Sequence, residues 1–111
     1  MFLHHKKNSF SHYIHSNTDS ITFIINGDAC DDKFSFYETI SQALNLPDYF
    51  GKNLDTLEEI LFDLDFIDQT YCQLIIFNYS HLMANEPDYK LALQELLESI
   101  ESEFLEIILI P

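Results

Sequence analysis

The chain has 111 residues, of which 47% are hydrophobic, and a formal net charge of −14 that arises from 19 acidic residues against five lysines and no arginine. This hydrophobic content excludes a disordered acidic tail, and the length suits one domain with a single core. The charge argues against direct binding to nucleic acid or to an anionic membrane surface, because both require clustered basic side chains.

Residues 1–20 are predicted to form a flexible or additional N-terminal segment, because they are rich in His, Ser and Asn without any periodicity. They carry a charge of +1, which leaves −15 for residues 21–111. His12 and His15 have the spacing of a shared helix face, but no cysteine or nearby carboxylate completes a metal site. We therefore expect one folded domain over residues 21–111, with no metal and no other cofactor.

The cellular location is inferred from what the sequence lacks. The first ten residues have no uninterrupted apolar region of the kind found in signal peptides, and no apolar run approaches the ~18 residues needed to span a bilayer. Cys30 and Cys72 are too few for a disulfide scaffold, so we expect two reduced, buried thiols. A cytoplasmic protein is the default expectation.

Three apolar runs predict β-strands. Residues 21–25 form a β-branched and aromatic run that stops at the turn residues Asn26 and Gly27. Residues 74–77 and 107–110 have the same character, and the last run could extend back to Leu105. Their nearly continuous apolarity indicates burial on both faces, as in a parallel sheet.

Helical patterns lie between these runs. Ser35 and Glu38 have the spacing of a capping box at the start of a first helix, which ends at Pro47. Asn53 is a favourable N-cap for a second helix, whose buried face is formed by Leu54, Leu57, Ile60, Leu61 and Leu64. A third helix is predicted over residues 87–102, with Pro87 in its first turn.

The order of these elements is strand, helix, helix, strand, helix, strand. Strands separated by helices require crossover connections, which are right-handed and place the strands parallel. The sequence therefore predicts an α/β fold with a small three-stranded parallel β-sheet covered by about three or four α-helices.

The outward face of the second predicted helix is acidic, and it is formed by Asp55, Glu58, Glu59, Phe62 and Asp63. Like charges three or four residues apart destabilise a helix by about 0.2–0.5 kcal/mol per pair. No basic residue within the helix balances this negative charge. The nearest lysine in sequence, Lys52, comes just before the helix. A cationic partner would relieve this repulsion, whereas a solvated face of an acidic protein is the alternative interpretation.

The segment LPDYFGKNLDTLEEIL at residues 46–61 resembles the motif of the barstar family, intracellular inhibitors of a secreted bacterial ribonuclease. The Ile-Ile-Asn-Gly sequence ahead of the motif and the terminal Ile-Ile-Leu strand are similar too, so the resemblance covers about residues 21–110. It implies a barstar-like fold, in which this helix and the loop before it block a ribonuclease active site. Carboxylates then take the place of the substrate phosphates.

The resemblance also implies which side chains bind the partner. Tyr49 matches an aromatic residue that packs on the nuclease, and Asp55 and Glu59 match two acids one helical turn apart. Glu59 is one methylene longer than the aspartate expected there, and Glu58 stands where the family inhibitor has tryptophan. Phe62 lies on the same face, and we expect it to supply an apolar contact. No residue is assigned a catalytic role.

The leading hypothesis is therefore an inhibitor or immunity protein that binds a basic, secreted ribonuclease toxin in a 1:1 complex. An acidic interaction module on the same fold, with a partner other than a nuclease, is the alternative. An enzyme that uses Asp55 and Glu59 as acid and base is disfavoured, because an open helix face offers neither a cleft nor two different environments.

Overall fold

The computed structural model describes residues 20–47, 50–64 and 67–111. Apart from Ser20, the predicted N-terminal segment over residues 1–20 lies outside the described residues, and so does Tyr49. The described chain contains the strands and helices β1 (Ser20–Asn26), α2 (Lys33–Leu44), α3 (Leu54–Asp63), β2 (Tyr71–Phe77), α4 (Pro87–Ile100) and β3 (Leu105–Leu109). Two 3-10 helices, η2 (Gly27–Ala29) and η3 (Tyr79–His81), follow β1 and β2.

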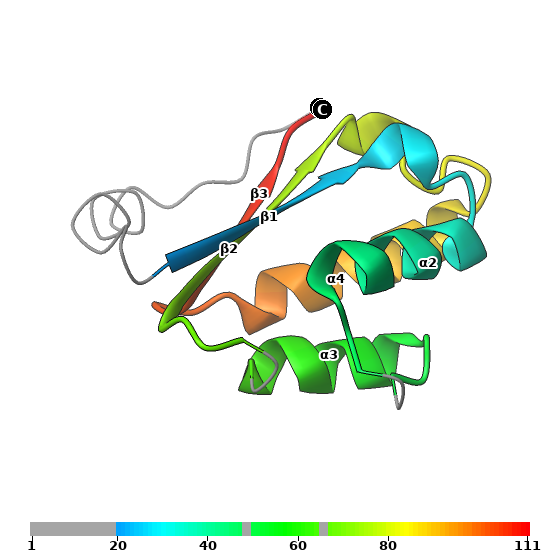
Figure 1. Ribbon diagram of the computed structural model, residues 1–111. Helices are drawn as coiled ribbons and strands as arrows, with labels where there is room; N and C mark the ends of the chain where they lie inside the picture. The colour runs from blue at the N-terminus through cyan, green and yellow to red at the C-terminus, as the bar shows by residue number, and fades with distance from the viewer. Residues whose placement is uncertain (1–19, 48–49, 65–66) are drawn as a thin grey trace.

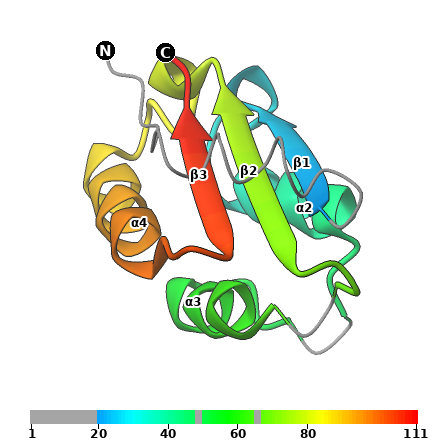
Figure 2. The same ribbon diagram turned by 90° about the vertical axis from the view of Figure 1, so that its left-hand side faces the viewer.

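The three strands form one parallel sheet in the order β1-β2-β3, as predicted. The α-helices lie on one side of this sheet, with α2 against β1, α4 against β3, and α3 beside α4 (Figures 1 and 2). This arrangement confirms the predicted α/β fold. No α-helix in the described ranges has the length and hydrophobicity of a membrane span.

The hydrophobic core lies between the sheet and the helices. Alternate residues of each strand face it, and one such row joins Ile25, Ile76 and Leu109 across the sheet. Burial on both faces was expected, but this prediction is wrong for β1, where Ile24 is 59% exposed. The reason is that the described helices cover only one face of the sheet.

The opposite face of the sheet carries a polar row, and this row explains where β2 begins. The Thr22 hydroxyl donates to Gln73 Oε1 over 3.2 Å, and Gln73 Nε2 donates to Glu106 Oε1 over 3.0 Å. The Tyr71 hydroxyl also donates to Glu106 Oε1, over 2.9 Å. Because Gln73 interrupts the apolar run, the sequence prediction began at Leu74, three residues after the observed start at Tyr71.

Helix α2 begins three residues earlier than predicted. Asp32 is its N-cap and accepts a hydrogen bond from the Ser35 backbone N–H at 2.8 Å, while Ser35 Oγ accepts from the Asp32 N–H at 3.1 Å. The hydrogen bonds that the Asp32 carboxylate accepts from the Ser35 backbone N–H and from the Ser35 hydroxyl lower the pKa of this carboxyl. Ser35 is thus the third helical residue of the capping box and not its N-cap, and the predicted role of Glu38 in a box is wrong. The end of the helix before Pro47 is confirmed by the left-handed C-cap at Asn45.

The last two elements agree with prediction apart from their C-terminal boundaries, since β3 ends at Leu109 and not at residue 110. Pro87 is the first residue of α4, as expected, but the helix ends at Ile100 and not at residue 102, because Glu101, with a ψ of 140°, is not helical. The final strand does extend back to Leu105.

Candidate functional site

Helix α3 is held in place by its cap and by two buried leucines. Asn53 is its N-cap, as predicted, and Asn53 Oδ1 accepts a hydrogen bond from the Thr56 backbone N–H at 2.9 Å. Leu57 and Leu61 are fully buried in the core. Because these positions fix the rotation of the helix about its axis, the opposite face is directed to solvent.

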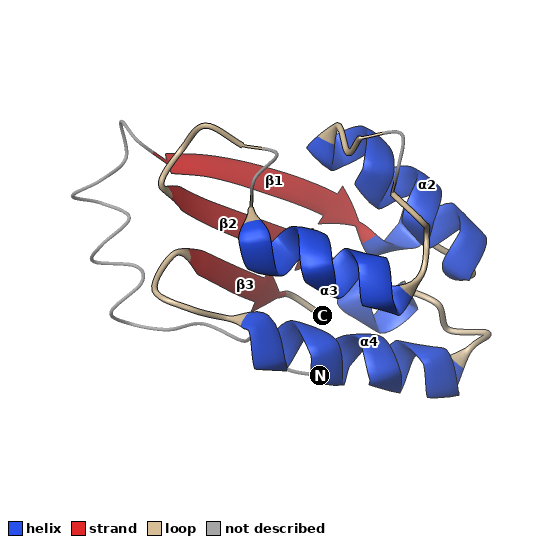
Figure 3. Ribbon diagram, turned by 90° about the horizontal axis from the view of Figure 1, so that it is seen from below, coloured by secondary structure: helices blue, strands red, loops and turns tan. Residues whose placement is uncertain are grey.

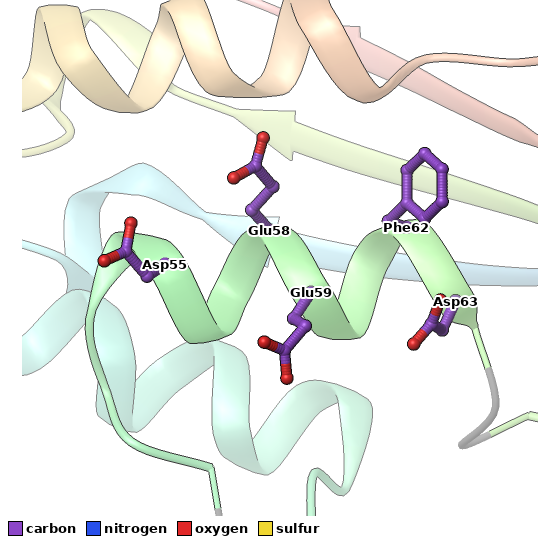
Figure 4. A pocket seen from close by; sticks show the side chains of 5 residues that line it. All are labelled: Asp55, Glu58, Glu59, Phe62 and Asp63. Atoms are coloured by element: carbon purple, nitrogen blue, oxygen red, sulfur yellow. The ribbon is translucent and has the colours of Figure 1, made fainter.

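That solvent-facing side forms an open groove of about 360 Å³, lined by Asp55, Glu58, Glu59, Phe62 and Asp63 (Figure 4). We refer to it as the acidic groove. In Figure 4, Glu58 and Phe62 point from α3 to the side on which α4 lies, and Glu59 points to the other side. Phe62 is 75% exposed. The structure therefore brings together four of the five residues that the sequence singled out.

Tyr49 and Asp63 differ from the four predicted residues that line the groove. Tyr49 lies outside the described residues, so its role remains a prediction. Asp63 also lines the groove. No binding role was predicted for Asp63, although its spacing of four residues from Glu59 is a signal for the same helix face. Phe50, which follows Tyr49 in the chain, is buried and packs edge-on against Tyr37, with ring centroids 5.8 Å apart. This contact anchors the loop before α3 to the core.

The negative charge of the acidic groove has no compensating cation among the described residues. The two ion pairs in the described part of the chain join Lys52 to Glu38, with 3.0 Å between Nζ and Oε1, and His81 to Asp28. Neither pair involves a carboxylate of the groove. Lys52, the nearest lysine in sequence, is therefore directed to α2 and leaves the groove anionic.

The geometry suits binding better than acid–base chemistry. All four carboxylates of the acidic groove are exposed and share one solvated environment, whereas an acid–base pair needs two environments that separate the pKa values. The described cysteines are also poorly suited to nucleophilic chemistry, because both are buried and burial raises the pKa of the Cys72 thiol to about 12. The groove can act by presenting anionic oxygens and one aromatic ring.

The chain matches a known protein family. Residues 21–107 match the family described as Barstar (barnase inhibitor), a region that includes α3 and the loop before it. Comparison with curated proteins gives no match.

Proposed function

Since the chain belongs to the barstar (barnase inhibitor) family, we propose that it is an inhibitor or immunity protein that blocks the active site of a basic, secreted ribonuclease toxin. The acidic groove of α3 and the loop before it form the blocking surface. The observation that carries this proposal is that four carboxylates are exposed in one groove without a cationic partner among the described residues.

The mechanism is competition with RNA for a cationic cleft. A ribonuclease must hold an RNA phosphodiester backbone, so basic side chains surround its catalytic site. A carboxylate resembles a phosphate in offering anionic oxygens as acceptors to Arg, Lys and His donors. Carboxylates four residues apart on α3 have their backbone held by the helix, so binding orders their side chains but not their backbone.

Phe62 gives the surface an apolar centre. The family inhibitor has tryptophan at the position of Glu58, and here the aromatic side chain stands four residues later at Phe62. Both residues point to the same side of α3 (Figure 4). We propose that the aromatic contact has moved by four residues along α3, about 6 Å, so the cognate nuclease has an apolar recess displaced by that amount.

We propose further features of this protein and of its complex with the ribonuclease. The folded unit is the domain over residues 21–111, and Tyr49 contacts the nuclease from the loop before α3. The complex has 1:1 stoichiometry, because one cleft accepts one helix. The protein resides in the cytoplasm, where it protects the cell against the ribonuclease, and it acts by binding without catalysis or cofactor.

One feature favours a second function, an acidic interaction module with a partner other than a nuclease. Glu58 adds a charge where the family inhibitor has an apolar ring, and this difference alters the centre of the binding surface. Affinity capture from the native cytoplasm separates the two functions. A resident protein without nuclease activity would support the module, whereas a toxin would support the inhibitor.

The proposed function is tested by titrating the purified chain into the captured ribonuclease and, in parallel, into barnase. We expect RNA cleavage by the cognate enzyme to stop at one equivalent. The association rate should fall steeply with salt, because the Debye length shrinks from about 30 Å at 0.01 M to about 8 Å at 0.15 M. A captured ribonuclease that remains fully active in the complex would contradict the proposal.

A further inference from the structure

A second pocket lies outside the acidic groove, at the end of the molecule where α2, α3 and α4 all begin (Figures 1 and 3). Its volume is about 390 Å³, which is within the range of small-ligand sites. Residues from the first turns of α2 and α4 and from the segment before α3 line it. We refer to it as the aromatic pocket.

Three aromatic side chains form the apolar part of this pocket. The hydroxyl groups of Tyr37 and Tyr89 are hydrogen-bonded to each other, and the two rings meet edge to face with centroids 6.4 Å apart. Burial and this hydrogen bond raise the pKa of Tyr37, so the floor of the pocket is uncharged. Phe34 is 73% exposed at the rim. The exposed part of the Phe34 ring offers a flat apolar group a surface that is otherwise in water.

The pocket is lined by two lysines and one carboxylate, Glu38, in a chain that is strongly acidic overall. Lys33 Nζ lies 5.3 Å from the centroid of the Tyr89 ring and 5.8 Å from that of Phe34, which places the ammonium group over both rings. Among the described residues Lys33 has no ion pair, although the chain is strongly acidic. Lys52, held by Glu38, lines the same pocket. Two of the three described lysines therefore converge at one site.

We propose that the aromatic pocket is a second partner-binding site, which receives an aromatic side chain together with an adjacent carboxylate from an acidic segment of the bound protein. The aromatic group packs against Phe34 and Tyr89, and the carboxylate pairs with the ammonium group of Lys33. Charge complementarity supports this occupant. Glu38 in the pocket is paired with Lys52, and the Glu86 carboxylate accepts from the Lys33 backbone N–H, so the Lys33 ammonium group is left to favour an anion.

The position of the pocket explains why a protein segment is the occupant. Lys52 and Asn53 line the pocket and come directly before α3, and Asp55 of the acidic groove lies in the first turn of that helix. A protein that covers the groove is thus adjacent to the pocket. Negative and positive sites side by side fix the orientation of the partner on α3. The inference rests on the proposed function only in naming the ribonuclease as the source of the segment.

The chemistry of the pocket is tested on the full chain with indole-3-acetate, an aromatic ring that carries a carboxylate. Titration is followed by ¹H–¹⁵N NMR, and tryptamine, with the same ring but an ammonium group, is the matched probe. We expect saturable shifts around Phe34 and Tyr89 with a Kd of about 1 mM, the affinity typical of a ligand of this size. Tryptamine should bind there at least about five-fold more weakly, because its charge is repelled by Lys33.

Variants separate this site from a nonspecific apolar contact. Phe34→Ala and Lys33→Glu should each weaken indole-3-acetate binding at least about five-fold, since each removes one half of the proposed recognition. Phe104→Ala, which truncates another exposed phenylalanine outside the pocket, should leave it unchanged. The absence of saturable shifts at the pocket, or equal binding by Lys33→Glu and the parent, would overturn the proposal.

Two further outcomes concern the occupant. Bound ribonuclease should displace indole-3-acetate from the pocket, and retention of the probe in the complex would overturn the assignment. A Kd below about 10 μM would instead indicate a site for a free aromatic acid and would also overturn it.

Asp55→Ala/Glu59→Ala should bind the probe as the parent does. A chain that binds the probe but inhibits no ribonuclease would therefore refute the proposed function without affecting the pocket chemistry.

Discussion

Replacing Glu59 with Gln should stabilise the free protein while weakening its complex with the ribonuclease. Glu59 faces Asp55 and Asp63 at four residues on either side along α3, and all three side chains are exposed. Removal of two like-charge pairs at about 0.2–0.5 kcal/mol each predicts a gain of about 0.4–1 kcal/mol in the free energy of unfolding. For a domain of this size the gain corresponds to a rise in Tm of about 2–6 °C. Gln has nearly the same shape and helix propensity as Glu, so charge is the main change.

The assay is thermal and urea denaturation of the parent and of Glu59→Gln at about 0.01 M and about 1 M salt, where the Debye length is about 30 Å and about 3 Å. The gain should appear at low salt and disappear at high salt. Glu103→Gln makes the same chemical change at an exposed residue outside the helices and serves as the control. A Glu59→Gln protein that is less stable than the parent at low salt, or a gain of equal size in Glu103→Gln, would refute the reasoning.

Three other predictions concern the fold that positions α3. Gly27→Ala should lower the free energy of unfolding by about 2–3 kcal/mol or more in urea denaturation, because a Cβ there would lie 2.2 Å from the Asn78 carbonyl oxygen. In the control Gly51→Ala the new Cβ meets only side chains, so the loss of stability should be smaller. Equal losses in the two variants would contradict this reasoning. Leu57→Ala truncates a fully buried side chain and should lower the free energy of unfolding by about 2–5 kcal/mol in the same measurement. A loss below about 1 kcal/mol would mean that this contact does not hold α3 in place. The free energy of unfolding should fall as pH rises from 9 toward 12, because burial raises the pKa of Cys72 from 9.0 to about 12 and the unfolded chain then releases the proton first. Denaturation at stepped pH should show a smaller fall in Cys72→Ala, and an unchanged slope in that variant would contradict this cause.

The order of elements and the acidic face could be predicted because both depend on local periodicity. Leu57 and Leu61 recur at helical spacing, so they define which side of α3 is buried and which side carries Asp55 and Glu59. Asn53 was recognisable as an N-cap because its side chain has a strong preference for that position.

The features that were missed depend on contacts between distant segments. The polar Gln73 belongs to β2 because Thr22 and Glu106 pair with it across the sheet, which no pattern in one strand reveals. The start of α2 was misplaced because Ser35 suits both the cap and the third helical position. The aromatic pocket joins Phe34 to Tyr89, 55 residues apart in the chain, and has no periodic signal.

The central claim, that the carboxylates of the acidic groove block a ribonuclease, is tested most directly by the inhibition constant of Asp55→Ala/Glu59→Ala against the cognate enzyme. Loss of two charges that pair with buried cations in the cleft predicts a weakening of about 3–5 kcal/mol, or at least about 100-fold. The control Asp31→Ala/Glu103→Ala removes the same net charge from exposed sites outside the groove, so its inhibition constant should stay within about three-fold of the parent at 0.15 M salt. Equal inhibition by the two double variants would contradict the account.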